Sequence, residues 1–69
     1  MADHYYVNMN AQPNGDHEVH KNSCTRLPDV MNRQYLGLFE SCAPAVRKAK
    51  ESYWQSNGCY YCSLACHTT

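Results

Sequence analysis

Side chains that can bind a metal ion gather in two short stretches of this sequence. The earlier stretch contains His17, His20 and Cys24. The later stretch, residues 57–67, contains Cys59, Cys62, Cys66 and His67. Thiolates and imidazoles are the usual ligands of structural zinc sites, which take four of them in a tetrahedron. We therefore expect the two stretches to meet in the folded chain and to hold one Zn²⁺ ion.

The spacing within each stretch selects four of these residues as the predicted ligands. Cys59 and Cys62 form a Cys-x2-Cys turn, which presents two sulfurs to one ion. His20 and Cys24 are separated by three residues, which lets the chain leave a strand and direct both groups at one point. The predicted metal site is therefore Cys3His, made of His20, Cys24, Cys59 and Cys62. No catalytic residue is predicted.

Four other residues are possible alternative ligands. Cys66 is the main one, because it follows the Cys-x2-Cys pair after three residues. Cys42 lies on the apolar stripe of a predicted helix, where a free cysteine packs as a small hydrophobic residue. His67 lies near the end of the chain, where ordering is weakest. His17 points away from His20 if both belong to one strand, since successive side chains alternate between faces.

A thiol or redox role for Cys59 and Cys62 is an alternative reading of the same motif. Cys-x2-Cys pairs also occur in thioredoxin-like proteins. Those pairs lie at the start of a helix, where the helix dipole lowers the pKa of the thiol. Here the pair follows the predicted helix. Metal binding is therefore the favoured interpretation.

The N-terminal part of the chain predicts a β-hairpin over about residues 4–21. Residues 5–9 are rich in aromatic and β-branched side chains, which are enriched in strands. Asn14-Gly15 is a strong hairpin signal, and residues 16–20 form a plausible return strand. The apolar run over about residues 35–39 predicts a third strand, in which Gly37 suggests a bulge.

One helix is predicted over about residues 42–56. Ser41 is a good N-cap, Pro44 falls in the first turn, and apolar residues recur at helical spacing from Cys42 onward. Gly58 is expected to end the helix in a left-handed conformation, before a cysteine knuckle over residues 58–67. The predicted fold class is thus α+β, a single small zinc-stabilised domain with a hairpin and third strand packed on one C-terminal helix.

The size and cysteine content of the chain support a metal as its stabilising element. Domains of 69 residues are marginal without a disulfide or a metal. No signal peptide is visible, and no apolar run approaches the roughly 20 residues of a membrane span. We therefore expect a cytoplasmic protein without membrane contact. In a reducing cytosol, an odd count of five cysteines favours metal over disulfides, which are the second choice.

Residues 19–62 resemble the Ada-type metal-binding domain, and more closely its short stand-alone relatives. The resemblance is carried by Val19-His20-Lys21-Asn22-Ser23-Cys24-Thr25-Arg26-Leu27, by Asn32-Arg33 before a short strand, by an Ala-rich helix and by Cys59-x2-Cys62. It implies a small β-sheet with one helix and one zinc. Ada itself uses four cysteines and transfers a methyl group from a DNA phosphate to a zinc-bound cysteine, whereas His20 replaces the first thiol here. The whole chain is also similar to small uncharacterised bacterial proteins.

These observations predict a non-enzymatic zinc-binding module that contacts a protein partner. A nucleic-acid-binding module is an alternative that the Ada-like resemblance implies. The formal net charge of zero and the 17% of charged residues are unlike the basic surface of a nonspecific nucleic-acid binder. The basic run over residues 47–50 is expected to be a solvated helix face. The third function that stays open is the thiol or redox role of Cys59 and Cys62.

Overall fold

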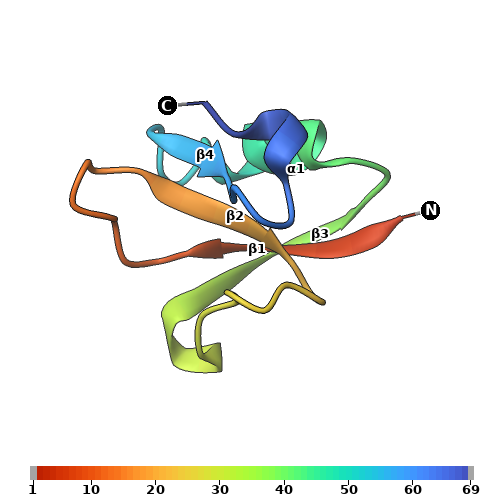
Figure 1. Ribbon diagram of the computed structural model, residues 1–69, viewed down its shortest axis with the longest axis horizontal. Helices are drawn as coiled ribbons and strands as arrows, with labels where there is room; N and C mark the ends of the chain where they lie inside the picture. The colour runs from red at the N-terminus through yellow and green to blue at the C-terminus, as the bar shows by residue number, and fades with distance from the viewer. Residues whose placement is uncertain (1, 69) are drawn as a thin grey trace.

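The computed structural model describes residues 2–68 as a four-stranded mixed sheet with one α-helix packed on one face (Figure 1). In chain order the elements are β1 (Asp3–Asn8), β2 (His17–Lys21), the 3-10 turn η1 (Val30–Asn32), β3 (Arg33–Phe39), α1 (Cys42–Ala49), β4 (Ser56–Gly58) and the 3-10 turn η2 (Leu64–Cys66). The strand order across the sheet is β3-β1-β2-β4. The predicted α+β class, with a hairpin, a third strand and one helix, is confirmed.

The hairpin pairs β1 and β2 antiparallel, with Tyr6 opposite His20 and Val7 opposite Val19. The loop between the strands turns at Gly15, whose φ of 93° is readily adopted only by glycine. This register places Val7 and Val19 on the face that α1 covers, where both are fully buried. His20, one residue further along β2, therefore points to the other face of the sheet.

Strand β3 pairs antiparallel with β1 and contains the bulge that Gly37 suggested. Tyr5 lies opposite Gly37, but the next residue, Tyr6, lies opposite Tyr35, so Leu36 is an extra residue in β3. Gly37 has a φ of 136°, which a residue with a Cβ rarely adopts. Because of the bulge, Leu36 is buried on the same side as Tyr5.

The fourth strand, β4, was not predicted. It has three residues and pairs parallel with β2, with Gly58 opposite Val19. The segment Ser-Asn-Gly has no apolar or β-branched residue, so its local pattern gives no strand signal. Its pairing depends on the backbone of a strand that is distant in the sequence.

The helix is shorter than expected, and its predicted stop is wrong. Helix α1 ends at Ala49 rather than near residue 56. Gly58 does not have positive φ, and it lies in β4 instead of capping a helix. The chain leaves the helix early because residues 50–55 must bring β4 back beside β2. The His17 N–H donates to the Gln55 carbonyl across this return, at 2.9 Å.

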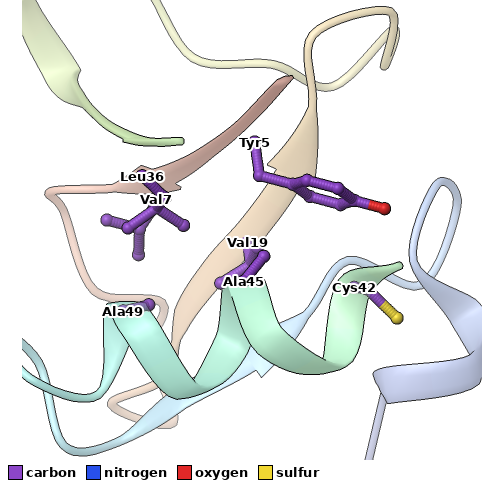
Figure 2. Packing of buried hydrophobic residues seen from close by; sticks show 7 residues of the cluster. All are labelled: Tyr5, Val7, Val19, Leu36, Cys42, Ala45 and Ala49. Atoms are coloured by element: carbon purple, nitrogen blue, oxygen red, sulfur yellow. The ribbon is translucent and has the colours of Figure 1, made fainter. Parts of the chain in front are cut away.

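The hydrophobic core lies between the sheet and α1 (Figure 2). Figure 2 shows side chains from the strands directed at Ala45 and Ala49 of the helix. The buried members are Tyr5, Val7, Val19, Leu36, Cys42, Ala45 and Ala49. Alanines allow the short helix to approach the sheet closely, but they bury little apolar area per residue. Among residues 2–68, no helix has the length and apolar character needed to cross a membrane.

Candidate metal centre

The four predicted ligands converge in the structure. The ligand atoms of His20, Cys24, Cys59 and Cys62 all lie within 4.8 Å of one another. His20 comes from β2, Cys24 follows a turn after that strand, and the Cys59–Cys62 turn follows β4. Two pairs that are far apart in the sequence therefore form one cluster that could hold a metal ion.

The parallel pairing of β2 with β4 brings the two ligand pairs together. Gly58 lies opposite Val19, so the next residues along the two strands, Cys59 and His20, are neighbours. The Cys59 N–H donates to the Val19 carbonyl at 2.9 Å and continues the pairing by one residue. The strand that the sequence did not predict is thus the element that assembles the cluster.

Gly58 is needed at this position for close packing rather than for a left-handed conformation. A Cβ atom at Gly58 would lie 2.7 Å from the Ser63 carbonyl oxygen and 2.8 Å from the Cys66 Cβ. Both distances are far below ordinary van der Waals contact. The chain after the Cys59–Cys62 turn therefore folds back directly over the Gly58 backbone.

Each of the three sulfurs accepts a backbone N–H. The donors are Lys21 to Cys62 at 3.2 Å, Arg26 to Cys24 at 3.3 Å and Tyr61 to Cys59 at 3.4 Å. Hydrogen bonds of this kind favour the ionised form of the acceptor. The backbone around the cluster is thus arranged to support thiolates, which are the metal-binding form of cysteine.

The imidazole of His20 is buried with an unpaired nitrogen. Only 1% of His20 is exposed, and its Nδ1 has no hydrogen-bond partner within residues 2–68. Its Nε2 lies 3.8 Å from Glu18 Oε1. Burial lowers the pKa of His20, which favours the neutral imidazole that ligates metals. An unpaired buried nitrogen is costly, and a bound metal ion would satisfy it.

The three thiols lie close together, and a positive charge among them would favour their ionised form. The pKa of Cys24 is raised to about 12, chiefly by burial and to a smaller extent by the neighbouring Cys62 thiol, while the Arg26 N–H acts in the opposite direction. Burial also raises the pKa of Cys59. A cation at the centre would reverse this effect, since a coordinated thiol is deprotonated. These properties fit a cluster that could hold a metal ion.

Two of the alternative ligands are bonded to each other. Cys42 and Cys66 form a disulfide that joins the start of α1 to η2, with Cα atoms 6.2 Å apart. This corrects the expectation that Cys66 competes for the metal and that Cys42 is a free hydrophobic residue, because neither sulfur can ligate while bonded. The odd count of five cysteines predicted metal binding rather than disulfides. In the structure two cysteines form a disulfide, and the other three belong to the cluster.

The two alternative histidines also lie outside the four-residue cluster. His17 Nδ1 is 2.9 Å from the Asn8 carbonyl oxygen, and its ring stacks on Tyr53 with centroids 4.0 Å apart. His67 Nδ1 is 3.0 Å from the carbonyl oxygen of Gly58. Both imidazoles therefore have structural contacts of their own, and His67 supports the backbone that leads into Cys59.

The cluster is closed on one side and open on the other. Cys59 is 1% exposed, whereas Cys24 and Cys62 are half-buried. They line an open cavity of about 360 Å³ together with Lys21, Ser23, Thr25 and Tyr61. The Arg26 guanidinium lies over the Tyr61 ring, 4.2 Å from its centroid, and links the Cys24 loop to the Cys59–Cys62 turn.

Comparisons with known proteins gave no match: no protein-family model fits the chain, and no curated protein or solved structure is detectably similar to it. The resemblance to Ada-type domains therefore rests on the short motifs themselves.

Proposed function

We propose that the chain is a non-enzymatic module stabilised by one structural Zn²⁺ ion, bound by His20, Cys24, Cys59 and Cys62, and that the folded module contacts a protein partner. The observation that carries the zinc assignment is the distance of 3.8 Å between the Cys24 and Cys59 sulfurs. Zinc–sulfur bonds of about 2.3 Å at a tetrahedral angle place two sulfurs about 3.8 Å apart. The two thiols are thus at the spacing of zinc ligands and not of a disulfide.

A set of four protein ligands supports a structural role. Catalytic zinc sites keep one coordination position open for water or substrate, whereas structural sites fill all four with protein atoms. Three thiolates and one neutral imidazole fill that shell here. Soft sulfur ligands favour zinc over magnesium, calcium and manganese, which prefer oxygen.

The energetic need for the metal follows from the core. Four of its seven buried members are Tyr5, Val7, Val19 and Leu36, and the others are two alanines and a disulfide-bonded cysteine. A structural zinc contributes on the order of 10–16 kcal/mol of apparent binding free energy, which is coupled to folding. The ion would join the ends of β2 and β4.

Elemental analysis of the purified chain tests this function. We expect about one zinc per chain and, after stripping with a chelator, loss of the far-ultraviolet circular dichroism of the folded form. Purified protein that is folded, free of metal and unresponsive to added zinc would overturn the proposal.

A further inference from the structure

Within residues 2–68, the long edge strand β3 pairs with another strand on one side only. In the order β3-β1-β2-β4, strand β3 has seven residues and β4 has three. The edge of β4 is covered by the chain itself, because the Thr68 N–H donates to Asn57 Oδ1 at 2.9 Å and His67 contacts the Gly58 carbonyl. Strand β3 thus offers a row of backbone N–H and C=O groups to a further strand.

Side chains on the outer face of β3 are unusually apolar for an exposed edge. Tyr35 lies opposite Tyr6, and Leu38 lies opposite His4, so both are on the face away from α1. Tyr35 is 52% exposed and Leu38 is 57% exposed. Edge strands of monomeric proteins usually carry charges or prolines at such positions.

The geometry points to a second copy of this chain as the strand that covers β3. We propose that two copies pair antiparallel through β3 about a twofold axis, with Leu36 of one copy opposite Gly37 of the other. Twofold dimers are the commonest symmetric assemblies, and a self-complementary edge is what they require. The two sheets would join into one continuous sheet of eight strands.

The bulge in β3 selects this register. Leu36 and Gly37 both face the core side, because Leu36 is the extra residue of the bulge. Pairing Leu36 with Gly37 of the second copy keeps every facing pair on the same side of the joined sheet. A register shifted by one residue would place outward side chains opposite inward ones, which buried strand pairs do not tolerate.

In this register the exposed groups complement each other. Tyr35 of one copy faces Leu38 of the other, so the two exposed apolar side chains cover each other twice in the dimer. Continuing this register by one residue past the end of β3 brings Glu40 of the second copy opposite Arg33. Glu40 is exposed and has no ion-pair partner within residues 2–68. Arg33 donates to the Pro28 carbonyl through one nitrogen and keeps other donors free.

This interface goes beyond the proposed function and does not involve the metal. The candidate ligands come from β2, from the turn after β2 and from the turn after β4, whereas β3 lies at the other edge of the sheet. A zinc-loaded chain that is monomeric would therefore refute the dimer and leave the metal site unaffected.

Sedimentation of the zinc-loaded full chain over a concentration series tests the interface. We expect a concentration-dependent monomer–dimer equilibrium and, for Leu38→Lys, dimerisation weakened by about ten-fold or more, because two symmetric apolar pairs are lost. Leu64→Lys is the matched control, since Leu64 is 60% exposed and lies in η2. A monomer at every concentration, or equal effects of the two variants, would overturn the proposal.

Charge reversal identifies the register. Glu40→Arg alone and Arg33→Glu alone should each weaken the homodimer, because like charges would face each other twice. An equal mixture of the two variants should restore dimerisation, since both facing pairs then carry opposite charges. Circular dichroism checks that each variant is folded. Folded variants whose mixture stays as monomeric as the separate proteins would refute this register.

Discussion

Gly58 lies opposite Val19 in the parallel pairing of β4 with β2, and the residue after each of them is a candidate metal ligand. This single pairing sets Cys59 beside His20, and the turns that follow bring Cys24 and Cys62 to the same point. The metal site and the sheet therefore depend on each other. Metal binding is expected to stabilise the β2–β4 pairing most directly.

Removal of the metal should unfold the chain reversibly. Without a cation, three crowded thiols and an unpaired imidazole nitrogen would be left at the junction of two strands. We expect a chelator to abolish the cooperative thermal transition and one equivalent of zinc to restore it. A stripped chain that keeps its transition within a few degrees would show that the metal is not structural.

Two different substitutions of Cys62 should distinguish the contribution of this side chain to metal binding from its contribution to packing. Cys62→Ser removes a soft ligand, and we expect loss of metal and a decrease of about 4 kcal/mol or more in the free energy of unfolding. Cys62→His supplies another ligand at a half-buried position, so it should retain one zinc per chain. A Cys62→Ser variant that keeps one zinc per chain and the stability of the unsubstituted protein would contradict the assigned role of Cys62.

Gly58→Ala should weaken metal binding through the backbone. The added Cβ would meet the Ser63 carbonyl oxygen at 2.7 Å, which forces the turn after Cys59 away from β4. Gly15→Ala is the control, because it is strained by a φ of 93° in the hairpin loop, away from the site. We expect both variants to lose stability and, because binding is coupled to folding, some zinc affinity, with the clearly larger loss of affinity for Gly58→Ala in a competition titration. Unchanged zinc affinity in Gly58→Ala would count against the close-packing account.

The disulfide should stabilise the fold without being part of the metal site. The Cys42–Cys66 crosslink spans 24 residues, and the loss of unfolded-state entropy that it causes corresponds to about 3 kcal/mol. The double variant Cys42→Ser/Cys66→Ser should therefore denature at lower urea concentration, yet bind one zinc. If the double variant lost the metal, Cys66 or Cys42 would have to be counted among the ligands.

Local sequence signals were sufficient for the hairpin, the third strand and the four residues that form the His/Cys cluster. Asn14-Gly15 marks the hairpin loop, and Gly37 marks the bulge, because both glycines adopt a positive φ. The spacing of the candidate ligands is also local, since the two members of each pair are joined by a single short turn. These features could be read from neighbouring residues.

The structural features that the sequence did not predict depend on contacts between residues that are far apart in the sequence. Strand β4 has a polar Ser-Asn-Gly sequence and exists through its pairing with β2. The apolar pattern extended the predicted helix to residue 56, but the return of the chain to β2 ends the helix at Ala49. The partner of Cys42 was hidden for the same reason, since Cys66 lies 24 residues away in the sequence and meets Cys42 only in the folded chain.

Cobalt substitution is the most direct test of the central claim that three thiolates and one imidazole share a single ion. Titration of the stripped chain with Co²⁺ should saturate at one equivalent, with visible bands of tetrahedral cobalt and a charge-transfer band for three cobalt–thiolate bonds. Saturation without tetrahedral bands, or a charge-transfer band that is unchanged in Cys24→Ser, would contradict the proposed site.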